Sequence, residues 1–193
     1  MKKLLIIIIA AAITVIAAYG YITNEMFPLS YRNNISRYAE EYGVEQALIA
    51  AVIKTESNFK PNAASGKGAK GLMQLTKDTL FWLYSKTPDL EEFDEEHLTD
   101  PEKNIRYGTL NLSLLISKYG DETTALAAYN AGQGRVDKWL TDSRYSKDGK
   151  TLISIPYDET DKYIKRVMLY KKIYKILYPD LKKNNLVVIN KTI

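Results

Sequence analysis

The chain of 193 residues contains no cysteine and a single histidine, His97. The absence of cysteine excludes disulfide bonds, thiolate metal sites, a catalytic thiol and a lipid-modified cysteine. One histidine excludes a histidine-rich metal site and makes any serine–histidine mechanism depend on His97 alone, which we interpret as an ordinary loop residue.

Glycine and proline are also scarce, with 10 and 6 residues, while hydrophobic residues make up 46% of the sequence. This composition is typical of a globular protein and excludes a disordered or repetitive one. The length favours one domain. A net charge of +4 is too small to indicate nucleic acid as a partner.

The charges are unevenly distributed along the chain. Acidic residues are concentrated between Asp89 and Glu102, and basic residues are concentrated near the C-terminal end, at Lys162, Lys165, Arg166, Lys171, Lys172, Lys175, Lys182 and Lys183. We interpret the basic stretch as a solvated helix face, with contact to an anionic envelope polymer or a lipid surface as the alternative.

The N-terminus has the pattern of an export signal or a membrane anchor, because Lys2 and Lys3 precede an uncharged run from Leu4 to Ala18. With residues 19–22 added, a helix here nearly spans the ~30 Å hydrocarbon core. Small residues around Ala18 suit signal cleavage, whereas the β-branched run 6–9 suits an uncleaved anchor, which we favour. Residues 1–22 are therefore predicted to be a signal peptide or anchor that delivers the rest outside the cytoplasm, membrane-anchored, or secreted if cleaved.

From Ser30 onward, apolar residues recur at helical spacing and predict a mostly α-helical domain over residues 30–180. Residues 181–193 are expected to be a C-terminal tail, in which 186–189 is a candidate short strand. The expected helices cover about 31–42, 44–55, 72–83, 101–119, 123–130, 135–140 and 157–178. The Asp100-Pro101 pair and Gly120 give the clearest helix start and stop.

Glu56 is the residue that we single out from local chemistry. Leu48, Val52 and Glu56 fall one turn apart on one helix flank, which points the carboxyl toward the core. A carboxyl placed against apolar packing serves as a proton donor or is satisfied by local donors. The alternative is a partly exposed glutamate at a helix end.

Five blocks of residues, taken in order, resemble the lytic transglycosylase domain of the soluble, goose-lysozyme-like type. The resemblance covers about Tyr31 to Tyr178. The blocks are Glu56-Ser57; Gly71-Leu72-Met73-Gln74; Asn104-Ile105 with Gly108; Ala127-Ala128-Tyr129-Asn130-Ala131-Gly132; and Pro156 with Glu159-Thr160 and Tyr163. One departure follows Gln74-Leu75, where the family often has a proline and this chain has Thr76, which can still cap a helix.

The resemblance implies a single lysozyme-like domain with a groove for the glycan strands of peptidoglycan. The domain is expected to be all-α, although the lysozyme-like superfamily as a whole is classed as α+β. It implies cleavage of the β-1,4 bond between N-acetylmuramic acid and N-acetylglucosamine, without a metal or other cofactor. Glu56 takes the place of the single catalytic acid. The remaining positions take roles in substrate binding (Ser57, Met73, Gln74, Tyr129, Asn130 and Tyr163) or in structure (Gly71, Gly132 and Glu159).

A single acid is unusual, because most glycosidases need two carboxyl groups. In the non-hydrolytic route, Glu56 protonates the leaving oxygen and then deprotonates the sugar's own 6-hydroxyl, which gives a 1,6-anhydro product. Tyr129 is expected to hydrogen-bond the carboxyl. The acidic run from Asp89 to Glu96 keeps a hydrolytic muramidase as an alternative, and a non-catalytic wall-binding protein is another.

Overall fold

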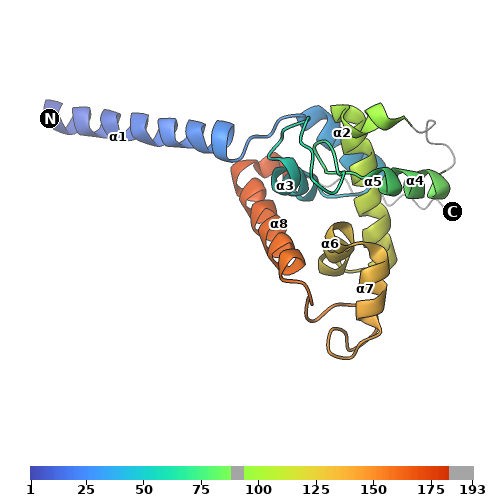
Figure 1. The fold of residues 1–193 in the computed structure, drawn as a ribbon. Coiled ribbons are helices and arrows are strands. Elements are labelled where there is room, and N and C mark those ends of the chain that lie inside the picture. Colours follow the sequence, from blue (N-terminus) through green and yellow to red (C-terminus); the bar gives the residue numbers. More distant parts are fainter. Residues whose placement is uncertain (88–93, 183–193) are drawn as a thin grey trace. The chain divides into compact units, whose positions relative to one another are not determined.

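The structure is a computed structural model that describes residues 1–87 and 94–182 (Figure 1). The chain divides into two compact units, residues 1–30 and the part that begins at Tyr31. The candidate strand at 186–189 and the first part of the acidic run lie outside the described residues.

The N-terminal unit is a long apolar helix. Helix α1 spans Lys2–Tyr21 and continues as the π-helical turn η1, Ile22–Met26, and neither contains a buried residue. Together they are long and apolar enough to cross a membrane, with a mean hydropathy of 2.5. Twenty helical residues are about 30 Å long, which matches the hydrocarbon core of a bilayer.

The second unit is built from helices, and the described residues contain only two isolated β-bridges and no strand. This confirms the predicted helical class. Its elements are α2 (Arg32–Tyr42), α3 (Gln46–Ser57), α4 (Lys77–Lys86), η2 (Glu95–Leu98), α5 (Pro101–Tyr119), α6 (Glu122–Ala131), α7 (Gln133–Leu140), α8 (Asp158–Leu177) and η3 (Pro179–Lys182).

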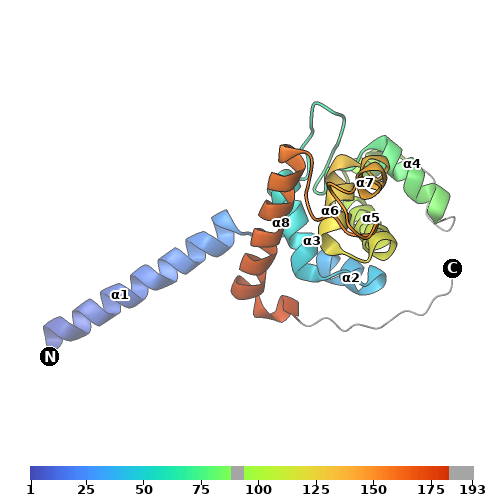
Figure 2. The same cartoon turned by 90° about the horizontal axis from the view of Figure 1, so that it is seen from below.

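Helices α3 and α5 form the centre of this unit. Every residue from Ala47 to Ile53 is buried, so α3 is enclosed on all sides by its neighbours, among them α2 and α8. A helix that is apolar all round needs such enclosure. Helix α5 packs against α2, α4 and α6, and Figure 2 shows these helices gathered around it.

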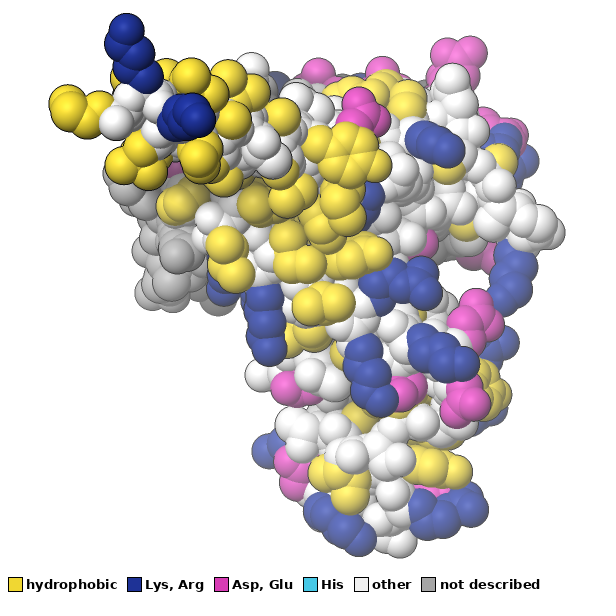
Figure 3. Space-filling view, turned by 90° about the vertical axis from the view of Figure 1, so that its left-hand side faces the viewer, with side chains coloured by type: hydrophobic (Ala, Val, Ile, Leu, Met, Phe, Trp, Pro, Cys, Tyr) yellow, Lys and Arg dark blue, Asp and Glu magenta, His cyan; other side chains and the backbone are white. Residues whose placement is uncertain are grey.

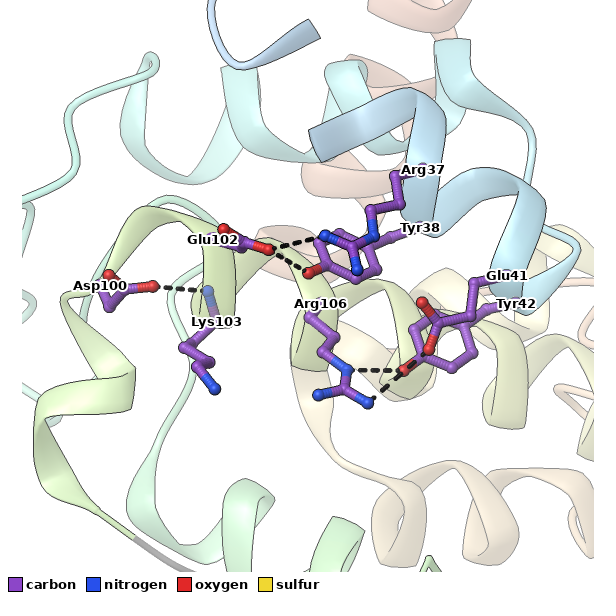
Figure 4. Close-up of polar contacts among 8 residues, drawn as sticks. All are labelled: Arg37, Tyr38, Glu41, Tyr42, Asp100, Glu102, Lys103 and Arg106. Carbon is purple, nitrogen blue, oxygen red and sulfur yellow. Dashed lines mark hydrogen bonds and ion pairs between the residues drawn. The ribbon is translucent and has the colours of Figure 1, made fainter. Parts of the chain in front are cut away.

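Polar side chains join α2 to α5 across their exposed edge (Figure 4). Glu102 accepts hydrogen bonds from Arg37 at 3.1 Å and from the Tyr38 hydroxyl at 2.7 Å. One turn further along α5, Arg106 donates to the Tyr42 hydroxyl at 3.1 Å. These contacts fix the register of α2 on α5.

Local capping sets the start and end of α5 as the sequence predicts. The Asp100 carboxylate accepts a hydrogen bond from the backbone N–H of Lys103 at 2.7 Å, and Pro101 occupies the first turn. Gly120 ends the helix in the left-handed conformation, with φ 66°. Both signals need only neighbouring residues, which is why the sequence alone reveals them.

The helix predicted for 72–83 begins later than expected. Residues 72–74 form turns, Leu75 lies in a β-bridge, and α4 starts at Lys77 after its N-cap Thr76. Two residues in left-handed conformations, Gly71 (φ 80°) and Gln74 (φ 49°), prevent a helix here. The segment 71–75 is thus a shaped loop beside the cleft described below.

Candidate active site

A cleft of about 250 Å³ opens at the C-terminal ends of α3 and α6. Glu56, Gln74, Tyr129 and Asn130 line it together with residues of the 65–76 loop. A second hollow of about 210 Å³ shares Thr79, Asn111 and Tyr129 with the first and extends to Trp82. The two hollows therefore adjoin each other, as the subsites of a groove for an elongated ligand would.

Glu56 reaches the cleft from the last turn of α3. Burial raises the pKa of its carboxyl to about 7, although the nearby Tyr163 hydroxyl lowers it in part. At neutral pH such a group is divided between its acid and its carboxylate, so it can both donate and accept a proton.

Two tyrosines flank the Glu56 carboxyl. Burial and the charge of Glu56 hold the pKa values of Tyr129 and Tyr163 well above the ordinary value, so both phenols stay protonated. The Tyr129 hydroxyl donates to the Met73 carbonyl at 2.8 Å, which differs from the expected hydrogen bond to Glu56. The buried Tyr163 hydroxyl has no partner with hydrogen-bond geometry among the described residues, and it is the phenol that approaches the carboxyl.

Asn130 and Gln74 lie on the cleft wall with their amides held in place. The Asn130 side-chain oxygen accepts a hydrogen bond from the Thr160 hydroxyl at 2.9 Å, and Asn130 lines the cleft. Gln74 donates to the carbonyls of Gly71 at 3.0 Å and Ala63 at 3.1 Å, and these contacts fold it onto the loop.

The structure places two expected substrate-binding side chains away from the cleft. Met73 is fully buried, and its side chain occupies the space above Gly108, where an added Cβ would lie 2.4 Å from the sulfur. Ser57 is buried and donates to the Ile53 carbonyl at 3.1 Å within α3. Met73 reaches the site through its backbone carbonyl, because that oxygen holds Tyr129.

Asn104 is a buried residue that the sequence analysis included in a motif without giving it a role. Its side-chain oxygen accepts from the Met73 N–H at 2.7 Å, and its N–H₂ donates to the carbonyls of Leu98 at 2.7 Å and Lys70 at 3.1 Å. The Asn104 side chain therefore satisfies backbone groups in and beside this loop that are not paired within a helix.

The expected structural residues occupy different environments. Gly71 (φ 80°) has no room for a side chain, because a Cβ would lie 2.2 Å from the Leu98 carbonyl oxygen. Gly132 (φ 92°) turns the chain between α6 and α7 in open space. Glu159 is exposed at the cleft rim, 3.9 Å from Lys67 across the opening.

The acidic run contributes no carboxylate to the cleft lining within the described residues. Asp94 caps η2, and Glu95 pairs with Lys70 at 3.1 Å and Lys77 at 2.7 Å. In the described ranges, no group of three or more histidine or acidic side chains is arranged to hold a metal ion. Of the two carboxyls that line the cleft, Glu56 is partly buried with a raised pKa, and Glu159 is exposed at the rim.

Comparison with known proteins places this cleft in a family context. Residues 33–153 match the Transglycosylase SLT domain. The soluble lytic murein transglycosylase of Salmonella typhimurium is 35% identical over 78% of this chain and 24% of its own length. The membrane-bound lytic murein transglycosylase C of Edwardsiella ictaluri is 38% identical over 55% of this chain and 32% of its own length.

A solved structure agrees with these relatives. An inactive mutant of the lytic transglycosylase Slt from Pseudomonas aeruginosa superposes with a TM-score of 0.68 and 36% identity, over 78% of this chain and 24% of that one. The chain thus spans about a quarter of the length of its soluble relatives. Sequence blocks, helical fold and relatives agree, and the chain belongs to the Transglycosylase SLT domain family.

Proposed function

We propose that this protein is a peptidoglycan lytic transglycosylase that cleaves the β-1,4 bond between N-acetylmuramic acid and N-acetylglucosamine and leaves a 1,6-anhydromuramic end. The observation that carries the proposal is the Glu56 carboxyl, which lines a cleft together with Tyr129 and Asn130 and has a pKa raised to about 7. The names of the relatives support the same substrate.

In the first step, neutral Glu56 gives its proton to the bridging oxygen as the bond to the anomeric carbon breaks. Positive charge develops on that carbon, and the substrate's acetamido group stabilises it. Glu56 is left as a carboxylate in a partly buried site, where the approach of the protonated Tyr163 favours the charged form.

In the second step, ionised Glu56 takes the proton of the sugar's own 6-hydroxyl, and that oxygen bonds to the anomeric carbon. No water is consumed, so neither a second carboxyl nor a positioned water is required. Because the attacking oxygen already belongs to the reacting sugar, its proximity lowers the barrier by several kcal/mol. Glu56 ends the cycle protonated.

Binding roles follow from where the side chains lie. Asn130 offers amide donors to the sugar, because Thr160 holds its oxygen. Tyr129 supports the loop through the Met73 carbonyl and lines both hollows. Gln74 shapes the wall from its loop contacts. In this proposal Met73 and Ser57 serve the site through backbone support and packing.

Digestion of purified sacculi tests the reaction. The full-length chain should release muropeptides with anhydro ends, which are lighter by one water than reducing-end products, and mass spectrometry separates the two. Glu56→Gln should fold and lose turnover by at least about a hundredfold. The matched control Glu40→Gln changes an exposed glutamate on α2 and should retain full activity.

Three results would contradict the proposal. Reducing-end products alone would assign a hydrolytic muramidase, and glycan binding without cleavage would assign a wall-binding protein. Near-normal turnover by Glu56→Gln would remove Glu56 from its role.

We further propose that α1 is an uncleaved anchor that keeps the second unit on the outer side of the cytoplasmic membrane. The length and hydropathy of the N-terminal helix support anchoring, as does the name of the membrane-bound relative. The two lysines before the helix support the orientation. The mass of the mature protein tests it, because cleavage would remove about the first 20 residues.

A further inference from the structure

We propose that the outer face of α8 docks on the anionic surface of a phospholipid membrane. This inference rests on the proposed anchoring by α1 and does not depend on the reaction. The face, which we call the outer α8 stripe, consists of Lys162, Lys165, Arg166, Leu169, Lys172 and Ile176, all of them exposed.

The outer α8 stripe combines cations with apolar side chains at helical spacing. Steps of three or four residues place its members along one side of the helix. Leu169 is 54% exposed and Ile176 is 73% exposed, and the two lie about 10 Å apart along the axis. Figure 3 views this side of the molecule and shows hydrophobic side chains adjoining lysine and arginine side chains.

The cations of α8 divide into two groups by their surroundings. Lys171 and Lys175 face inward, where Lys171 pairs with Glu45 at 2.9 Å and Glu122 at 2.7 Å, and Lys175 pairs with Glu45 at 2.6 Å. These two lysines serve the fold, and their charges are already compensated.

The outward group has much less compensation. Lys165 pairs with Asp161 at 2.6 Å at the edge of the stripe. Lys162, Arg166 and Lys172 have no acidic partner among residues 1–87 and 94–182. Three uncompensated cations around two exposed aliphatic side chains are the composition of a helix that lies at a membrane interface.

The connection to α1 keeps the second unit, which carries this stripe, close to a bilayer. Residues 27–31 join the end of η1 to α2, and five residues reach at most about 17 Å. A tethered unit meets the surface at high effective concentration, so a weak affinity is sufficient for docking. Each unpaired cation contributes about fivefold to that affinity on an anionic leaflet.

A lipid surface explains the stripe better than an anionic wall polymer does. A soluble polyanion would use the cations but would leave Leu169 and Ile176 in water. A bilayer accommodates both kinds of side chain. The aliphatic side chains enter the boundary between headgroups and acyl chains, while the cations stay among the phosphates.

The absence of cysteine makes a direct test simple. Single-cysteine variants Leu169→Cys, Ile176→Cys and the control Ser117→Cys, an exposed position on α5, carry a nitroxide label in the full-length chain. The chain is placed in nanodiscs of phosphatidylglycerol or of phosphatidylcholine. We expect the labels at 169 and 176 to lose collisions with a water-soluble nickel complex by roughly threefold or more in phosphatidylglycerol only, whereas the control label stays unchanged.

A second experiment removes the uncompensated charges of the stripe. Lys162→Gln, Arg166→Gln and Lys172→Gln together should weaken docking about a hundredfold and restore the collisions in phosphatidylglycerol. Equal accessibility in both lipids, or a chain that elutes apart from the discs, overturns the proposal. Protection of the labels by purified wall polymer but not by phosphatidylglycerol assigns the stripe to the polymer and overturns it as well.

Discussion

Glu56 illustrates at the scale of one residue how function opposes stability. The carboxyl ends a helix whose preceding residues are buried, and burial raises its pKa from 4.5 to about 7. The unfolded chain releases this proton at a lower pH than the folded protein does. Stability therefore falls as the pH rises from about 4.5 to about 7, and the full penalty is present above that range.

Glu56→Gln should consequently stabilise the protein at alkaline pH. At pH 8 the neutral amide avoids the burial of a charge, and the gain in unfolding free energy is at most about 3 kcal/mol. At pH 4 the carboxyl is protonated in both states, so we expect little difference. Thermal unfolding of the full-length chain in a nonionic detergent, followed by circular dichroism at both pH values, measures this.

The exposed Glu40→Gln is the control and should show no such pH dependence. A stabilisation by Glu56→Gln that is equal at pH 4 and pH 8 would show that the folded protein does not raise the pKa of Glu56.

At the scale of an element, the loop 71–75 is positioned by a residue of another helix. Asn104 on α5 binds the Met73 N–H, and the Met73 carbonyl in turn accepts from Tyr129 on α6. The position of the loop at the wall of the cleft therefore depends on how α5 packs. Gly71 permits this close approach, because the Asn104 side chain and the Leu98 carbonyl occupy the place of a Cβ.

Gly71→Ala should therefore destabilise the protein by more than about 4 kcal/mol. The new Cβ would lie 2.2 Å from the Leu98 oxygen and 2.3 Å from the Asn104 side-chain nitrogen, and φ is also unfavourable. Gly120→Ala is a matched control, because φ is 66° but the space around it is open. It should cost about 1–2 kcal/mol, and a similar loss in both variants would contradict the role of Gly71.

At the scale of the whole second unit, α8 is fastened by ion pairs to the starts of α3 and α6. Lys171, 12% exposed, lies between Glu45 and Glu122. Burial by itself raises the pKa of Glu45, but hydrogen bonds from Lys175 and Lys171 outweigh it and leave the pKa below its ordinary value. A lowered carboxyl pKa contributes stability at neutral pH that is lost as the pH falls through it.

Lys171→Met should destabilise the unit by about 1–3 kcal/mol at pH 7 and by less in acid, as the pH falls through the lowered pKa of Glu45. The next residue provides the control. Lys172→Met removes an exposed cation of the outer α8 stripe and should change stability by less than about 0.5 kcal/mol. Equal effects of the two substitutions, measured by thermal unfolding, would contradict the assignment of Lys171 to the fold.

The sequence by itself determined the features that depend on neighbouring residues. Asp100, Pro101 and Gly120 set the ends of α5 through contacts within one turn, and Thr76 caps α4 as its sequence position suggested. The apolar N-terminal run and the direction of Glu56 toward packed residues also follow from local periodicity. The family blocks were readable for the same reason.

Only the tertiary structure decided the features that join distant parts of the chain. Residues 72–75 form turns and a β-bridge in place of a helix, and in this arrangement Asn104, 31 residues away, accepts a hydrogen bond from the Met73 N–H. The Tyr129 hydroxyl donates a hydrogen bond to the Met73 carbonyl, 56 residues away, and not to the Glu56 carboxyl as the sequence predicted. Lys171 and Lys172 are equivalent in sequence, yet packing against Glu45 and Glu122 makes one structural and leaves the other at the surface. Such partners are chosen by the packing of whole helices, which no local spacing encodes.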